Sequence, residues 1–237
     1  MVLPDGCVDL IWQQGRGAFV AGPDTSPATN ALPPSAVLVG ARFHPGAGGP
    51  ALGIPLARLR DQRVDAFEFR PDLARRLPLD LSPDEALRLM RGVSAELVMA
   101  GPPDGLVVQA ARLVGDPRAR SADLVHALGV SERQLRRRFD AAVGYGPKTL
   151  QRVLRFQRFL ARITPRGEIS DLAQLAAETG YADQAHLTRE VGRLSGLSPA
   201  VLARNRTGVL PTAAGARIES GQGFPWSAEH LPAGQPT

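Results

Sequence analysis

The sequence has very little cysteine and no long apolar run. Cys7 is the only cysteine in 237 residues, which excludes an internal disulfide and a zinc site built from clustered cysteines, and which fits a reducing compartment. No stretch of about 18 consecutive apolar residues is present, so the sequence predicts no membrane span. The first residues also lack the basic and apolar pattern of a signal peptide. We therefore expect a cytoplasmic protein with no membrane contact.

Motifs for catalysis are missing as well. The histidines at positions 44, 126, 186 and 230 show no metal-ligand spacing, and Cys7 has no basic neighbour in sequence. A nucleophile elbow, a P-loop and a dinucleotide-binding fingerprint are all absent. The sequence therefore predicts neither an enzyme nor a bound metal or cofactor.

The positive charge of the chain is unevenly distributed. Residues 116–206 carry 16 basic side chains against 9 acidic ones, whereas residues 1–115 carry 11 against 12. A general preference for arginine, which supplies 27 of the 28 basic residues, explains the amount of arginine but not this asymmetry. A positive field confined to one segment is what a phosphate-binding module needs.

That basic segment contains a repeat with an offset of 52 residues. The stretch from Gly129 to Phe139 returns as Gly180 to Val191, with one extra residue in the second turn. Each copy has a glycine that permits a tight turn, followed by a residue suited to cap the next helix, Ser131 or Asp183. A short helix, a glycine turn and a capped second helix are the parts of a helix-turn-helix.

Helical spacing gives the second helix of each copy an inner and an outer face. Leu135 with Phe139, and likewise Leu187 with Val191, fall on one side, where we expect the core. The opposite side is predicted to contact DNA, because arginine can pair with guanine and glutamine with adenine. The predicted base contacts are Arg133, Arg136, Arg137, Gln184, Ala185, Thr188 and Arg189. The predicted phosphate contacts are Ser131, Arg138, Lys148, Arg152, Arg155, Asp183 and His186.

Two of these assignments have alternatives. The arginines of the first copy are also compatible with an ordinary solvated helix face, but the turn, the cap and the duplication together favour recognition. Arg138 lies near the core flank, so an acid is its alternative partner. Between the copies, Pro147 and Pro165 delimit an amphipathic stretch that predicts one helix over residues 147–163.

Residues 1–115 follow a different pattern. Val8, Leu10 and Trp12 alternate as in a strand, and 18–21 and 36–43 are further strand candidates. Helices are expected after residue 55, with Ser82 and Asp104 as N-caps. The expected fold class is therefore α+β. Its parts are a β-rich domain with trailing helices over 1–115, an all-α domain over 116–206, and a disordered tail over 207–237.

The segment 118–206 resembles the AraC/XylS family of bacterial transcription regulators. The resemblance is clearest in Leu175 to Tyr181, in Leu187-Thr188-Arg189, and in Gly196-Leu197-Ser198-Pro199. It implies two helix-turn-helices joined by a linker helix, with both recognition helices in neighbouring major grooves of double-stranded DNA. One departure is Val191, where the family usually has phenylalanine.

The N-terminal part resembles a sensor-like domain that precedes this module in some members of the family. Residues 3–12 and 40–47 carry this likeness, which implies a β-rich, partly cupin-like fold. Compared with such members, the chain lacks the opening strands, so we expect a truncated sensor. A small-molecule effector, RNA polymerase and a second copy of the chain, as in a homodimer, are the candidate partners besides DNA.

An alternative function is a ligand-binding or dimerisation module with only residual DNA affinity. Arg42 and His44 are then candidates for binding an anionic ligand, or else ordinary residues at the end of a strand.

Overall fold

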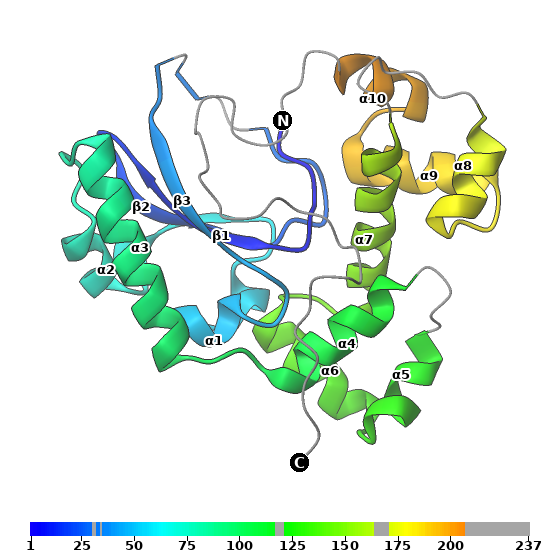
Figure 1. Ribbon diagram of the computed structural model, residues 1–237, viewed down its shortest axis with the longest axis horizontal. Coiled ribbons are helices and arrows are strands. Elements are labelled where there is room, and N and C mark those ends of the chain that lie inside the picture. The colour runs from blue at the N-terminus through cyan, green and yellow to red at the C-terminus, as the bar shows by residue number, and fades with distance from the viewer. Residues whose placement is uncertain (30–31, 34, 117–120, 164–170, 207–237) are drawn as a thin grey trace.

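A computed structural model describes residues 1–29, 32–33, 35–116, 121–163 and 171–206. The chain is an α+β protein in which a four-stranded antiparallel sheet with its covering helices lies beside a group of helices (Figure 1). Each part has its own hydrophobic core. The tail expected at 207–237 lies outside the described residues.

The sheet confirms the β-rich start of the chain. Its strands are β1 (Val8–Gln13), β2 (Gly17–Ala21), β3 (Leu38–Phe43) and β4 (Arg63–Asp65), in the order β3-β1-β2-β4. The alternation in β1 buries Val8, Leu10 and Trp12, as the sequence predicts. The indole N–H of Trp12 donates to the carbonyl oxygen of Pro78 at 2.6 Å, which satisfies the polar atom of a fully buried ring.

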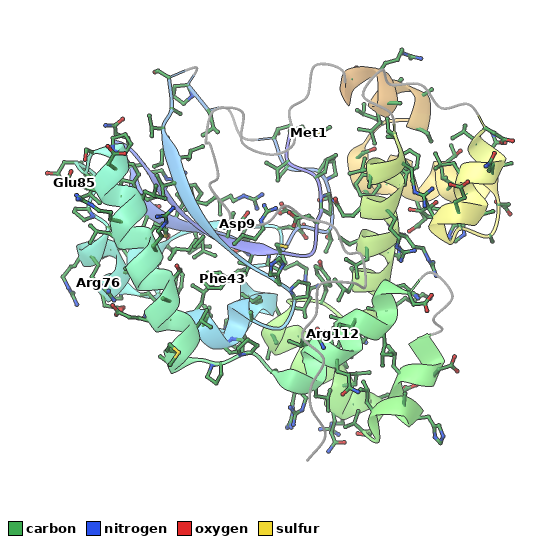
Figure 2. The ribbon with its side chains drawn as sticks, in the orientation of Figure 1. Met1, Asp9, Phe43, Arg76, Glu85 and Arg112 are labelled. Carbon is green, nitrogen blue, oxygen red and sulfur yellow. The ribbon has the colours of Figure 1, made fainter. Side chains whose placement is uncertain are left out.

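Helices cover this sheet. They are α1 (Gly48–Leu52), α2 (Pro71–Arg76) and α3 (Pro83–Ala100), with short 3-10 turns at Leu56–Arg58 (η1) and Ala66–Glu68 (η2). Ser82 caps α3 in a capping box with Glu85, as expected from the Ser-Pro start. Arg76 of α2, labelled in Figure 2, bonds Glu96 of α3 at 2.9 Å.

In the second part of the chain, all the regular secondary structure among the described residues is α-helical. Its helices are α4 (Gly105–Gly115), α5 (Ser121–Leu128), α6 (Glu132–Ala142), α7 (Pro147–Arg162), α8 (Leu172–Thr179), α9 (Gln184–Ser195) and α10 (Pro199–Arg206). Asp104 caps α4, as predicted. The buried residues of α4, such as Val107 and Ala110, belong to the same core as those of α5–α10, although α4 precedes the boundary expected at residues 115/116.

The long helix α7 stands at the centre of the helical part, with α4–α6 around one end and α8–α10 around the other (Figure 1). Pro147 occupies its first turn, as the sequence indicates. Its apolar side chains reach both groups of helices, and Leu150, Val153, Phe156 and Phe159 are all fully buried. Helix α7 therefore joins the two copies of the repeat through one continuous core.

The N-terminal part packs closely against the turn after α6. The guanidinium Nε of Arg60 donates to the carbonyl oxygen of Gly144 at 2.8 Å. A Cβ atom at Gly144 would lie 2.5 Å from Cγ of Pro23, and one at Gly49 would lie 2.2 Å from the carbonyl oxygen of Ala141. Only glycine leaves room for these backbones to approach so closely. The equivalent glycine in the second copy, Gly196, is exposed.

The close fit at Gly144 predicts an asymmetry between two equivalent glycines. Gly144 and Gly196 both have positive φ, 93° and 72°, so alanine is strained at either position. The Cβ of Gly196→Ala would meet Pro27 only at 3.7 Å, an ordinary contact. We therefore expect Gly144→Ala to reduce the free energy of unfolding by about 1–3 kcal/mol more than Gly196→Ala.

Denaturant unfolding of the two variants measures this difference directly. Equal losses would show that the contact between the N-terminal part and the turn at Gly144 does not constrain the fold.

Candidate nucleic-acid interface

The first copy of the repeat forms a capped helix with a sharply divided surface. Gly129 makes the turn with φ of 62°, and Ser131 caps α6 in a capping box with Gln134. Leu135 and Phe139 are buried at 3% and 0% exposure, which confirms the predicted inner face. The side chains predicted to read bases are all exposed on this helix: Arg133, Arg136 and Arg137. Arg136 makes only a loose ion pair with Asp140, at 3.8 Å.

The second copy repeats this construction. Gly180 ends α8 with φ of 85°, and the carboxylate of Asp183 accepts a hydrogen bond from the backbone N–H of His186 at 2.6 Å. Leu187 and Val191 are both fully buried. The predicted base contacts on α9 are again exposed: Gln184, Ala185, Thr188 and Arg189. Thr188 donates its hydroxyl to the backbone of Gln184 at 2.9 Å.

His186 has a local structural role. Its Nδ1 accepts a hydrogen bond from the backbone N–H of Ala182 at 3.3 Å, and its ring packs edge-on against Tyr181 with centroids 5.4 Å apart. Ser131 and Asp183 are also predicted phosphate contacts. Their side chains act as the N-caps of α6 and α9. The predicted phosphate contacts at these three positions stay predictions, and the caps fix where each recognition helix begins.

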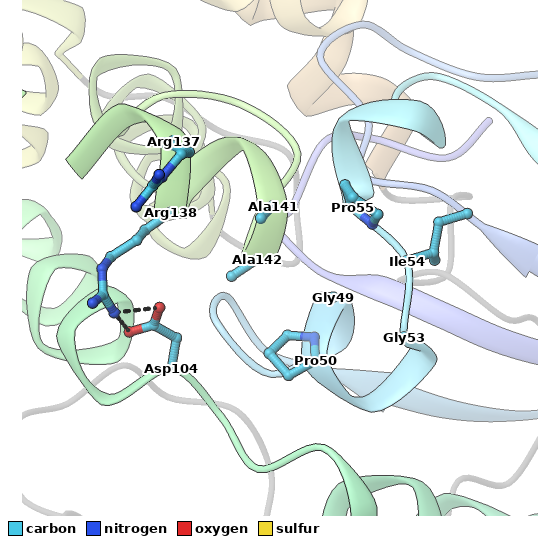
Figure 3. Close-up of a pocket in the computed structure, with 10 residues that line it drawn as sticks. All are labelled: Gly49, Pro50, Gly53, Ile54, Pro55, Asp104, Arg137, Arg138, Ala141 and Ala142. Atoms are coloured by element: carbon cyan, nitrogen blue, oxygen red, sulfur yellow. Dashed lines mark hydrogen bonds and ion pairs between the residues drawn. The ribbon is translucent and has the colours of Figure 1, made fainter. Parts of the chain in front are cut away.

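Arg138 is bonded to an acid, one of its two expected partners. Its guanidinium lies 2.9 Å from a carboxylate oxygen of Asp104, the residue that also caps α4 (Figure 3). The pair borders a groove of about 500 Å³ between α6 and the N-terminal part. Pro50, Ile54 and Ala141 are among the residues that line this groove, and Arg137 reaches it from α6 (Figure 3). The first recognition helix therefore lies directly beside the N-terminal part.

The basic residues of α7 differ in exposure and in bonding. Lys148 is exposed at the start of the helix. Arg152 is bonded to Glu190 of α9, and Arg162 to Glu178 of α8 at 2.7 Å. The Nε atom of Arg155 is buried and has no hydrogen-bond partner among the described residues. The ion pair with Glu190 occupies the Nε and Nη2 atoms of Arg152, which limits the contact that Arg152 can make with a phosphate.

Sequence reasoning did not identify Asp104, Glu178 and Glu190 as partners of these arginines. Each pair joins two different elements, and the partners are separated by 34, 16 and 38 positions in the sequence. Helical periodicity assigns a side chain to a face, but it does not say which other helix will cover that face.

In the N-terminal part, the guanidinium of Arg42 is already occupied. It donates to both carboxylate oxygens of Asp9, at 2.9 and 2.8 Å, and lies 3.0 Å from Asp5. Burial, together with the positive charge of Arg42, lowers the pKa of the neighbouring His44. An anionic ligand at this strand end would have to displace two carboxylates. Among the described residues, no group of three or more His, Cys, Asp or Glu side chains is arranged to hold a metal ion, and no described helix is long and apolar enough to cross a membrane.

A protein with two capped recognition helices on a shared central helix is a double helix-turn-helix protein. Residues 124–205 match the family described as a helix-turn-helix domain, and residues 1–65 match a domain family of unknown function, DUF6597. Residues 124–205 thus form an AraC-type helix-turn-helix domain, the DNA-binding domain of a transcription regulator.

Solved structures of ToxT from Vibrio cholerae are similar to this chain. ToxT of strain O395 is 13% identical with a TM-score of 0.47, covering 88% of this chain and 92% of ToxT. A wild-type ToxT structure with bound unsaturated fatty acid, from strain SCE256, is 11% identical with a TM-score of 0.44, covering 88% and 90%. Comparison with curated proteins gave no match.

The cap of α9 gives a test of how the second recognition helix is held. We expect Asp183→Ala to reduce the free energy of unfolding by about 1 kcal/mol, because the N–H of His186 loses its acceptor. Asp183→Asn keeps an acceptor oxygen and is expected to stay close to the parent protein.

Denaturant unfolding of the two variants separates the cap from the charge. A loss of the same size in both variants would assign the effect to the negative charge at the helix N-terminus and contradict the capping role.

Proposed function

We propose that the chain binds a specific double-stranded DNA site through α6 and α9, each entering its own segment of the major groove. The observation that carries this proposal is the duplicated, capped helix with an exposed polar face, present at both ends of α7 (Figure 1). Bases are read by the N-terminal residues of a recognition helix. In both helices, these residues are exposed and lie outside the core.

The length of the central helix is compatible with two successive groove segments. Helix α7 has 16 residues and therefore spans about 24 Å. Successive major-groove faces on one side of a duplex lie about 34–36 Å apart. Helix α6 precedes α7 and α9 packs on its side, so the distance between the exposed faces of α6 and α9 is not fixed by the length of α7 alone.

The proposed roles follow the exposed side chains. Arg133, Arg136 and Arg137 of α6 are the candidate guanine-binding residues, and Gln184 and Arg189 of α9 are the candidates for adenine and guanine. Lys148 is an exposed candidate phosphate contact at the start of α7. An effector, RNA polymerase and a second copy of the chain remain candidate partners that rest on the family resemblance.

Selection from a random DNA library tests the proposal. The expected result is a site of two short sequence blocks about one helical turn apart. Its binding should weaken steeply as salt concentration rises, because phosphate contacts release counterions. Binding that shows no preference over random duplex would sink the proposal.

Substitution of one arginine in each helix should separate the two blocks. We expect Arg137→Ala and Arg189→Ala each to weaken specific binding by about 1–3 kcal/mol, with the loss confined to the first or the second block respectively. Arg91→Ala, at an exposed position on α3 in the N-terminal part, is the matched control and should leave affinity unchanged.

Gel-shift titrations on the selected site and on sites with one block scrambled measure these effects. Parental affinity in both helix variants would refute the assignment of the exposed faces to base contacts.

A further inference from the structure

A row of arginines lies on the face of α7 that meets α8 and α9. Arg152, Arg155 and Arg158 follow one another at intervals of three residues, and all three side chains are partly buried. The Nη1 atom of Arg158 donates to the carbonyl oxygen of Thr179, the last residue of α8, at 3.0 Å. The Nε atom of Arg155 and the Nη2 atom of Arg158 are buried without a hydrogen-bond partner among the described residues.

Glu190 brings a carboxylate to this row from the second recognition helix. Its Oε2 lies 2.5 Å from Nε of Arg152, and its Oε1 lies 3.3 Å from Nη2, so the contact is made by both oxygens. The side chain of Glu190 is only 14% exposed and that of Arg152 only 23%, whereas the other ion pair of α7, between Arg162 and Glu178, is exposed. Bidentate arginine–carboxylate contacts fix the relative orientation of the two groups as well as their distance.

Like charges crowd this interface. Burial, and then the nearby charge of Arg155, lower the pKa of Arg158. The hydroxyl of Tyr181 lies among the same groups, and burial followed by the negative charge of Glu190 raises its pKa. A neutral side chain in place of Glu190 would leave these partly buried arginines facing α9 without the carboxylate that now binds Arg152.

The position of Glu190 on α9 connects this contact with the neighbouring side chains that are proposed to contact bases. Glu190 lies between Arg189, which is exposed, and Val191, which is fully buried. Successive residues of a helix are separated by a rotation of about 100°, so fixing Glu190 against α7 also fixes the direction of its neighbours.

We propose that Glu190 is a positioning residue for DNA recognition, and that its bidentate contact with Arg152 sets the rotation of α9 on α7. The direction in which Arg189 and Gln184 meet the second block of the DNA site then depends on a side chain that does not itself touch DNA. This inference rests on the proposed function. It gives α7 a role in the sequence specificity of α9 as well as in the spacing of α6 and α9.

The test compares the DNA sites selected by the full chain and by three variants. Glu190→Gln removes the charge, and the double variant Arg152→Gln, Glu190→Gln replaces the ion pair by two amides that can still hydrogen-bond. Glu178→Gln is the matched control, because Glu178 also bonds an arginine of α7 but at an exposed position. Affinity for random duplex and the thermal unfolding midpoint are measured in parallel, because a purely structural role would change these without changing base preference.

We expect Glu190→Gln to lower the preference for the second block about tenfold while the first block is read as before. The double variant should recover most of this preference, and Glu178→Gln should match the parent. Unchanged preference in Glu190→Gln, or an equal loss at both blocks, would overturn the inference.

A further variant covers the case in which Glu190→Gln fails to fold. Arg152→Lys keeps the positive charge but loses the planar fork, so it should weaken preference at the second block alone. Parental preference in Arg152→Lys would then overturn the inference. Failure of the parent chain to select any two-block site would instead contradict the proposed function, which keeps the two outcomes distinct.

Discussion

The helical part of the chain depends on the burial of α7 between the two copies of the repeat. A helix-turn-helix of about 30 residues cannot bury enough apolar surface to be stable alone. Here both copies pack on one helix, whose side chains Leu150, Val153, Phe156 and Phe159 lie in the core shared by all the surrounding helices. Because packed interiors deform little, this core limits the relative placement of α6 and α9, and the contact of Glu190 with Arg152 adds a polar constraint on α9. Two surfaces that are distant in sequence thereby become parts of one rigid unit.

The features that could be predicted from the sequence are those that depend on a few neighbouring residues. The glycine turns, the caps at Ser131 and Asp183, and the buried pairs on each recognition helix all follow from spacings of four residues or fewer. The duplication strengthened each of these predictions, because the same pattern appeared twice. The features that could not be predicted are pairings between distant segments, such as Arg60 with Gly144, which are 84 residues apart. No local preference determines which surfaces of a chain will meet.

At the junction between the N-terminal part and the helical part, contacts between distant segments make the two copies of the repeat differ. The repeat predicts equal surroundings for Gly144 and Gly196, yet Gly144 is buried against Pro23 and Leu56, whereas Gly196 is exposed. The N-terminal part is therefore fitted to the end of the first recognition helix, while the second is held by the arginines of α7. The two copies share one sequence pattern, but different contacts hold them in place. The N-terminal part also contacts α7, where the side-chain amide of Gln157 donates to the carbonyl oxygen of Pro4 at 2.6 Å, so its contacts with the helical part are not confined to α6.

Within the described part of the chain, some arginines of the helical part bond an acid on another helix, and others are exposed without such a partner. Arg138, Arg152 and Arg162 each bond an acid on another helix, which neutralises part of their charge and uses some of their N–H donors. Arg133, Arg137 and Arg189 are exposed and have no such acid partner among the described residues. Their charge is neutralised only by mobile ions, which DNA phosphates can replace at little cost. Net charge describes residues 116–206 as a whole, whereas the exposed arginines of the described ranges that bond no acid on another helix indicate the two faces that we propose for contact with DNA.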